Sequence, residues 1–315
     1  MQPLDGILVV DLTRLLPGAF AASELRRLGA RAVRVEPPEG DPLRSLASGW
    51  HSVLSAGTES VVCDLRADPE LARRLCARAD IVLEGFRPGV AARLGLGPKD
   101  VPKSAVYCSI TGFGVGGRHE QRAGHDLNYL GWAGALADTA PSLPPLQVAD
   151  LAAGGLTAVT EVLAALLERE RSGLGRRLVV SMTHGSHRLV AHRLGADPIP
   201  RLLTGGIACY QTYATADGRW LTIAALEPKF WRRLCELTGL PQLEGRAYEH
   251  RLPELEHVIG SRPLAAWLAL FDGEDVCAGP VWSLEEAAAE FGVAGAVPAP
   301  ALGEHTARWR DELGL

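Results

Sequence analysis

The sequence predicts an α/β fold in which a large domain with a doubly wound, mostly parallel sheet is joined to a smaller α+β domain. In the first two-fifths of the 315 residues, short β-rich runs alternate with helical stretches over short connections, which is typical of a parallel sheet. After residue 205 the pattern changes to two β-rich runs around a tight turn, followed by helices. We therefore expect a large domain over residues 1–204, a small domain over 205–275, and a return to the large domain over 276–315.

The first part of the chain supplies most of the expected parallel sheet. The β-rich runs occupy residues 6–12, 31–36, 60–65, 80–84 and 105–110, and helical stretches lie at 21–28 and 69–79. Gly29 ends the first helix and Pro37 stops the second strand, because glycine closes helices and proline cannot continue a sheet ladder. Ligands of such sheets bind at the carboxyl ends of the strands.

The second part begins with a long helical stretch and ends with the small domain. Residues 151–170 carry leucines at helical spacing, and residues 177–182 return to a strand pattern. Two β-rich runs then flank Asp217-Gly218, a pair that favours a primed two-residue hairpin turn. Helices are expected near 230–237 and 263–271, and residues 276–282 are expected to lead back to the large domain.

Composition excludes several classes of function. The net charge of −5 is spread along the chain, so neither nucleic acid nor an anionic membrane surface is expected as a partner. We expect no membrane span, because no apolar stretch approaches the ~20 residues that a span needs. We also expect no signal peptide, so the expected location is the cytoplasm. The six cysteines are scattered, and the clustered histidines lack a suitably spaced carboxylate or cysteine partner, so no metal site is expected (His184, His187, His192).

His125 and Asp150 are the candidates for acid–base chemistry. His125 follows Gly124 and precedes a helix expected to begin near Asp126, and its imidazole can exchange a proton near neutral pH. Asp150 precedes the long apolar helix, beside small residues 152–155 whose amide groups could hold an enolate oxygen. Either side chain could instead be a helix cap, and the local pattern favours that alternative for both.

Three other segments are less specific. Arg87 lies in a glycine- and proline-containing turn after a strand, which suits a phosphate contact and a surface salt bridge equally. Glu227 precedes a proline at a strand–helix junction and by itself reads as a surface glutamate. The glycine-rich residues 111–117 favour a mobile loop over a dinucleotide-binding loop, because no helix follows them directly.

Taken together, these segments resemble the family III CoA-transferases. The resemblance runs nearly end to end, through residues 3–12, 28–36, 80–97, 108–114 and 302–306. Three segments resemble the α-methylacyl-CoA racemase branch of the family: 124–129 with its histidine, 148–150 with the aspartate that both branches share, and 216–219 with 226–228 and its glutamate. The glycine-rich loop typical of the small domain in transferases is not evident.

The resemblance implies a racemase of 2-methylacyl-CoA thioesters, with His125 and Asp150 as the acid and base groups and Glu227 assisting. It implies CoA contacts at Asp64, Leu65, Arg66, Arg87, Gly124, Asp126 and Tyr129. No separate cofactor is expected, because CoA is part of the substrate, and family members imply an interlocked homodimer. Two alternatives stay open: a CoA-transferase that uses Asp150 as a nucleophile, and a relative without catalysis.

The chain departs from the family pattern in its expected positive charge. Pro37 stands where relatives often carry an arginine, and residues 56–60 replace a basic run before the third strand. The chain is also shorter than typical members near 195–203 and 290–300. The first two departures predict a CoA site with less positive charge than usual.

Overall fold

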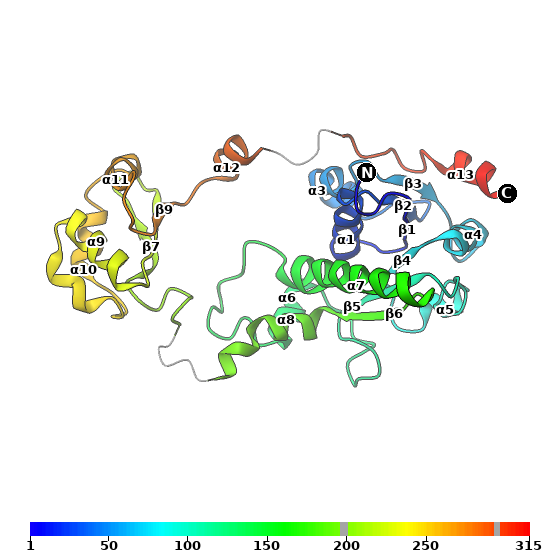
Figure 1. Ribbon diagram of the computed structural model, residues 1–315, viewed down its shortest axis with the longest axis horizontal. Helices are drawn as coiled ribbons and strands as arrows, with labels where there is room; N and C mark the ends of the chain where they lie inside the picture. Colours follow the sequence, from blue (N-terminus) through cyan, green and yellow to red (C-terminus); the bar gives the residue numbers. More distant parts are fainter. Residues whose placement is uncertain (196–200, 293–296) are drawn as a thin grey trace. The chain divides into compact units, whose positions relative to one another are not determined.

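The computed structural model describes residues 1–195, 201–292 and 297–315. The chain divides into two compact units, Met1–His192 with Ala294–Leu315, and Arg193–Val293 (Figure 1). The predicted shortened segments near 195–203 and 290–300 fall partly outside the described residues.

The first unit contains a six-stranded sheet in the order β3-β2-β1-β4-β5-β6, and every pairing in it is parallel. The strands are β1 (Leu8–Asp11), β2 (Arg31–Glu36), β3 (Glu59–Val62), β4 (Ile81–Glu84), β5 (Val106–Thr111) and β6 (Arg177–Ser181). The chain winds outward in one direction from β1 to β3 and in the other from β4 to β6. The predicted doubly wound parallel sheet is therefore confirmed, with its switch point between β1 and β4.

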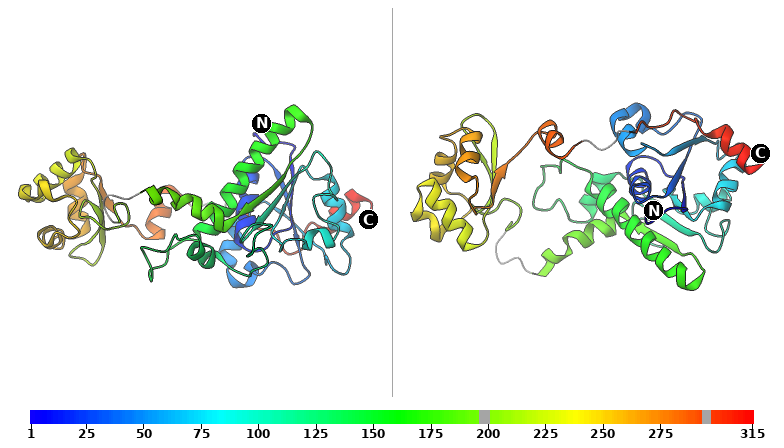
Figure 2. Two further views of the ribbon diagram at one scale, coloured as in Figure 1. Left: turned by 90° about the horizontal axis from the view of Figure 1, so that it is seen from below. Right: turned by 45° about the horizontal axis from the view of Figure 1, so that its top comes forward.

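Helices cover both faces of this sheet (Figure 2). The unit contains α1 (Leu16–Arg27), α2 (Leu43–Leu46), α3 (Ser48–Leu54), α4 (Glu70–Arg78), α5 (Val90–Arg93), α6 (Asp126–Trp132), α7 (Thr157–Ser172), α8 (Met182–Val190) and α13 (Thr306–Leu313). Alternate strand residues face opposite sides, so Val9 packs in the core with α1 and α7, whereas Val10 packs with α4 and α13. Strands buried on both faces explain the continuous apolar runs in the sequence.

The last residues of the chain cover the edge strand β3. The His305 amide donates to the Ser60 carbonyl at 2.9 Å, and the Val62 amide donates to Thr306 Oγ1 at 3.0 Å. Trp309, in α13, is 1% exposed and packs into the core on that face of the sheet. The end of the chain thus belongs to the first unit.

The second unit contains a three-stranded antiparallel sheet, β7 (Tyr210–Ala214), β8 (Trp220–Ala224) and β9 (Ala278–Pro280). Its helices are α9 (Pro228–Thr238), α10 (Pro253–Ile259), α11 (Leu264–Phe271) and α12 (Leu284–Phe291). Residues from 276 onward were expected to return to the first unit, but β9 pairs with β8 because its backbone completes the small sheet. The small unit therefore extends to Val293.

The turn between β7 and β8 differs from the predicted primed turn. Residues 215–219 connect the strands, and Gly218 has φ +74° whereas Asp217 does not have a positive φ, as a type I′ turn would require. The Asp217 carboxylate instead accepts hydrogen bonds from Thr215 Oγ1 at 2.6 Å and from the Leu264 amide at 3.2 Å. Asp217 therefore ties the hairpin to the start of α11.

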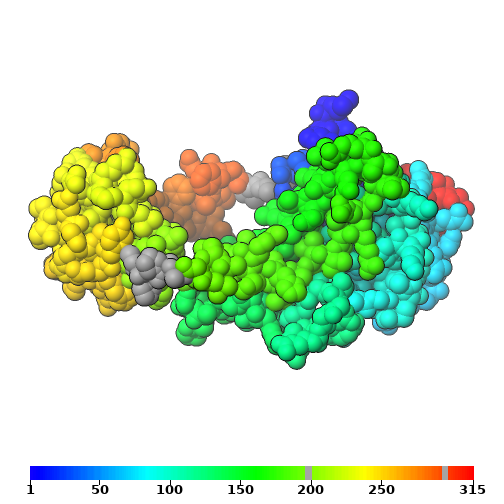
Figure 3. Space-filling model, turned by 60° about the horizontal axis from the view of Figure 1, so that its bottom comes forward, coloured from blue at the N-terminus to red at the C-terminus, as the bar shows by residue number. Residues whose placement is uncertain are grey.

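One long helix runs through Ala149–Ser172, where a π-helical segment (Ala149–Leu156) continues into α7. Among the described residues it alone is long and apolar enough to span a membrane by length and composition, with a mean hydropathy of 1.5 over its best window. The prediction that no apolar stretch is long enough to span a membrane is therefore wrong for this helix. Half of the window is buried in protein, and a core helix meets the same criterion. Leu167 of this helix is exposed, and Figure 3 shows part of the helix on the surface of its unit.

Candidate functional site

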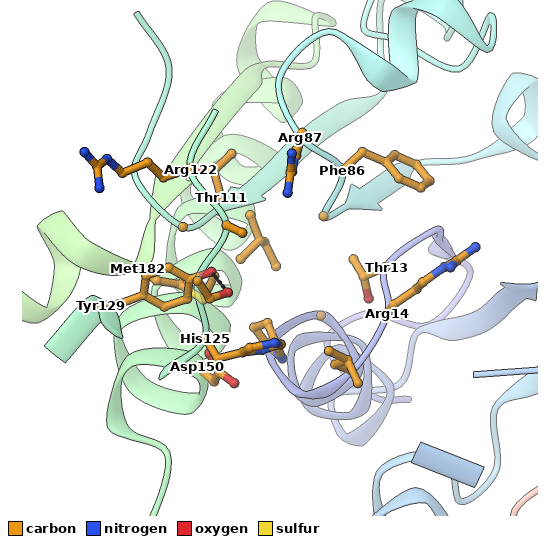
Figure 4. A pocket seen from close by; sticks show the side chains of 18 of the residues that line it. Thr13, Arg14, Phe86, Arg87, Thr111, Arg122, His125, Tyr129, Asp150 and Met182 are labelled. Carbon is orange, nitrogen blue, oxygen red and sulfur yellow. Dashed lines mark hydrogen bonds between the residues drawn. The ribbon is translucent and has the colours of Figure 1, made fainter. Parts of the chain in front are cut away.

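A cavity of about 470 Å³ opens at the carboxyl ends of β1, β4 and β5, next to the switch point of the sheet (Figure 4). Residues 13–15 after β1, 85–88 after β4 and 110–112 at the end of β5 contribute to its wall. Residues 122–125 and the start of α6 close another side. This is the place where an open parallel sheet binds its ligands.

Both candidates for acid–base chemistry line this cavity. His125 and Asp150 come from different elements, and Figure 4 shows both side chains among the residues that line the cavity. Gly124, Tyr129 and Arg87 line the same cavity, so five of the predicted site residues are brought together.

Asp150 lies inside a helix and is not its cap. It is the second residue of the π-helix, and its amide donates to Asp126 Oδ1 at 2.9 Å. The small residues after it serve packing, because a Cβ on Gly154 would lie 3.0 Å from Met182 and one on Gly155 would lie 2.7 Å from Phe20. The helix therefore lies close to α1 and α8 and presents Asp150 at the cavity, whereas residues 152–155 do not line it.

The Asp150 carboxyl group is buried without a cation. Its residue is 9% exposed, and within the described ranges no ion pair or side-chain hydrogen bond reaches its carboxylate. Burial, and secondly the negative charge of Asp126, raise the pKa of Asp150 from 3.8 to about 7. Such a group is present in both protonation states near neutral pH.

His125 is the N-cap residue of α6, as the sequence predicted. Its amide donates to Asn128 Oδ1 at 3.1 Å, and its carbonyl accepts from the Asn128 amide at 2.8 Å. The Tyr129 hydroxyl donates to the Gly124 carbonyl, and a Cβ on Gly112 or Gly124 would lie under 3.0 Å from the Tyr129 ring. Glycine is therefore required at both positions, and Tyr129 fixes the backbone before the histidine.

A buried charge network fixes the loop after β1. Arg34 lies between Asp11 and Asp41, with nitrogen–oxygen distances of 3.5 and 3.4 Å. Asp11 Oδ1 accepts from the Thr13 amide at 2.8 Å and from its hydroxyl at 2.6 Å, and Asp41 accepts from the Leu15 amide at 3.1 Å. Leu15 has φ +64°, a conformation that costs energy outside glycine, so the network holds this wall in place against strain.

A second cavity of about 410 Å³ adjoins the first. Arg14 and Phe86 line both cavities, and the second continues along residues 37–39 after β2 and 63–66 after β3. The predicted contacts at Asp64, Leu65 and Arg66 all lie here. The two cavities together follow the carboxyl ends of five strands and suit an elongated ligand.

Arg14 is the residue that sequence reasoning missed. Its side chain lies at the junction of the cavities, where it is exposed and has no ion pair within the part of the chain that the structure describes. A signal existed, since Arg14 follows the carboxyl end of the first strand. The order of the strands places the carboxyl end of β1 in the middle of the sheet, and a short window of sequence does not reveal that order.

Only one of the two predicted losses of positive charge lies on these cavities. Pro37 lines the second cavity. Glu59 instead accepts from Arg31 at 2.9 Å and from Trp309 Nε1 at 2.6 Å, and Arg308 lies within ion-pair distance. Glu59, which lies in the segment that replaces the basic run, therefore belongs to a structural cluster of side chains next to α13.

The remaining candidates lie elsewhere. Glu227 is the N-cap residue of α9 in the second unit, and its assisting role stays a prediction. His184 lines a separate cavity beside β6, and a His187 ring nitrogen lies 3.0 Å from the Ala133 carbonyl oxygen. Within the described ranges no three His, Cys, Asp or Glu side chains are grouped to hold a metal ion.

Comparison with known proteins gives consistent matches over nearly the whole chain. The family model for CoA-transferase family III matches residues 4–306. An alpha-methylacyl-CoA racemase from Mus musculus is 37% identical over 309 residues, which cover 90% of this chain and 79% of the relative. A succinyl-CoA:glutarate CoA-transferase from the same organism is 32% identical over 92% of this chain and 74% of its own length.

Solved structures resemble the chain over the same extent. A CAIB/BAIF family protein from Brucella suis has a TM-score of 0.85 at 27% identity and covers 99% of both chains. A hypothetical protein from Mycobacterium tuberculosis has a TM-score of 0.83 at 30% identity, covering 98% of this chain and 99% of its own. Fold and sequence therefore agree, and the similar proteins include both a racemase and a transferase.

Proposed function

Because this chain belongs to CoA-transferase family III, we propose that it is a racemase of 2-methylacyl-CoA thioesters that uses His125 and Asp150 as its two bases. The observation that carries the proposal is that one cavity is lined by both an imidazole and a buried carboxyl group, whose pKa is raised to about 7. A group whose pKa lies near the working pH is the most effective proton donor and acceptor.

The proposed reaction moves one proton at the α-carbon. One side chain takes the α-proton, and the electron pair of the C–H bond passes into an enolate whose oxygen carries the negative charge. The conjugate acid of the other side chain then returns a proton to the opposite face. In the reverse direction the two groups exchange roles, so Asp150 must serve both as acid and as base, which a pKa of about 7 allows.

The enolate oxygen needs hydrogen-bond donors close to these groups. One well-placed donor contributes about 3 kcal/mol to the transition state. The Asn128 and Tyr129 amides of α6 already donate to the His125 carbonyl, so they are not these donors. The CoA portion would extend along the second cavity, past Arg87, Arg14 and Arg66.

The test is exchange of the α-hydrogen in deuterated water. A single epimer of a 2-methylacyl-CoA should gain deuterium at the α-carbon and convert to the other epimer. His125→Ala and Asp150→Asn should each lower the rate about 10²–10⁴-fold. His184→Ala is the matched control, since this histidine lies outside the cavity, and should retain the rate. Absence of exchange while the thioester binds would refute the proposal.

A CoA-transferase is the second candidate, because transferases also match the chain and the Asp150 carboxyl group borders the cavity. There the Asp150 carboxylate attacks the thioester carbonyl, and the C–S bond breaks to give an acyl-aspartyl anhydride and CoA thiolate. This candidate predicts transfer of labelled CoA to a free acid, unaffected by His125→Ala. The racemase is preferred because it gives His125 a role.

We also propose that the enzyme acts as a cytoplasmic homodimer without a separate cofactor and that Glu227 assists His125.

A further inference from the structure

The second cavity has a balanced set of charges. Four charged residues line it: Arg14 and Arg66 carry positive charge, and Glu39 and Asp64 carry negative charge. The segment after β2 contributes two prolines and Glu39, and no cation. A ligand with many negative charges would therefore meet only two arginines there.

The arginines are available to a ligand, and the Asp64 carboxylate stays charged. Arg14 and Arg66 are exposed and form no ion pair with any residue in the ranges 1–195, 201–292 and 297–315. Asp64 accepts from the amides of Arg66 and Ala67 at 2.9 and 3.1 Å, and these hydrogen bonds lower its pKa. Glu39 is the other acidic side chain of this lining, and it is exposed. The local charge of the cavity is close to zero.

The place of Arg14 suits the middle of a CoA molecule. In CoA a diphosphate separates the pantetheine arm, which carries the thioester, from the adenosine, which carries a 3′-phosphate. Arg14 lines both the cavity that contains His125 and the cavity beyond it. Its loop is fixed by the Arg34 network, so the guanidinium group extends from a rigid backbone. The diphosphate is the group that would lie at this junction.

The structure assigns to Arg14 the binding of the diphosphate and, resting on the proposed function, we infer that the 3′-phosphate adds little to binding. CoA carries about four negative charges near neutral pH and dephospho-CoA about two. Arg14 and Arg66 match the two charges of the diphosphate, and no further cation lines the second cavity, whereas Glu39 repels a third phosphate. Dephospho-CoA thioesters should thus be ligands about as good as CoA thioesters.

Binding calorimetry with CoA and dephospho-CoA tests this inference without the need for turnover. The dissociation constants should agree within about threefold, since an exposed charge contributes little in water. Arg14→Met should weaken both ligands by about tenfold, because one charge-assisted contact is lost from each. Pro37→Arg should tighten CoA about fivefold or more and leave dephospho-CoA nearly unchanged. Arg171→Met, which removes an arginine from α7 that lines neither cavity, is the matched control.

The outcomes separate this inference from the proposed function. A preference of tenfold or more for CoA over dephospho-CoA would overturn the inference and leave the racemase proposal standing. If Arg14→Met weakens the binding of CoA but not of dephospho-CoA, Arg14 contacts the 3′-phosphate and not the diphosphate. That result would also overturn the inference. If the folded protein binds neither ligand, the proposed function itself fails.

Discussion

Two buried carboxyl groups of the first unit, Glu36 and Asp150, respond to burial in opposite ways. Glu36, at the end of β2, is 1% exposed and Asp150 is 9% exposed. Arg44 donates two hydrogen bonds of 2.7 Å to Glu36, and the Ser60 hydroxyl donates one of 2.6 Å. Burial acts to raise the pKa of Glu36, but these donors outweigh it and lower the pKa to about 2.

The difference shows what distinguishes a structural acid from a chemical one. Asp150 has the same kind of burial, but no cation offsets it; burial, and then the like charge of Asp126, raise its pKa to about 7. Glu36 therefore stays ionised and ties β2 to α2, whereas Asp150 can gain and lose a proton. The donors around each group, and not its depth, decide whether it is suited to proton transfer.

The largest effect is expected from removing the arginine that keeps Glu36 ionised. Arg44→Met leaves a buried carboxylate without its cation, so the free energy of unfolding should fall by about 3–5 kcal/mol in urea denaturation at neutral pH. Arg74→Met removes an exposed partner of Glu70 and is the control, with an expected loss of less than about 1 kcal/mol. Equal losses in the two variants would mean that the buried pair has no special role.

A smaller effect is expected in the pH dependence of stability when Asp150 is replaced. The folded-state pKa of Asp150 is raised from 3.8 to about 7, so its contribution to stability is fully present below about pH 4 and is lost as pH rises through 7. Relative to the native chain, Asp150→Asn should thus gain about 2–3 kcal/mol of unfolding free energy between pH 5 and pH 8. For Glu36, whose pKa is lowered to about 2, stability is instead lost as pH falls from 4.5 through 2.

The measurement compares urea denaturation of both proteins at the two pH values. Asp311→Asn serves as the control, because it removes an exposed carboxylate of α13 and not a buried one. A constant difference between Asp150→Asn and the native chain at pH 5 and pH 8 would show that Asp150 is ionised throughout.

The sequence predicted the bounds of the strands more closely than the residues at which the helices begin. Residues 31–36 were predicted as a strand and form β2 with the same bounds, because a β-rich run is stopped by prolines at one end. The first helix was expected from residue 21 but begins at Leu16, since proline is tolerated in a first turn and Pro17 lies there. Gly18 is required by a close approach, because a Cβ there would lie 1.9 Å from Thr13 Oγ1.

At the site, local pattern predicted His125 better than Asp150 or Arg14. The cap position of His125 followed from a glycine and the start of a helical stretch, both of which are local signals. The π-helix that carries Asp150 depends on packing of Gly155 against Phe20, a residue far away in sequence. Arg14 gains its place from strand order and from Arg34, which no short window of sequence contains.

The smallest expected effect sharpens the comparison by removing the charge of Asp126, the second cause of the raised pKa of Asp150. Asp126→Asn keeps an oxygen that can accept from the Asp150 amide, but it removes the negative charge that contributes to the raised pKa. Burial is the larger cause, so the pH profiles of racemisation in both directions should shift toward lower pH by only about half a unit to one unit. Glu120→Gln changes another carboxylate that lines the cavity and should leave the profiles in place. A shift toward higher pH in Asp126→Asn would show that Asp126 stabilises the ionised form of Asp150.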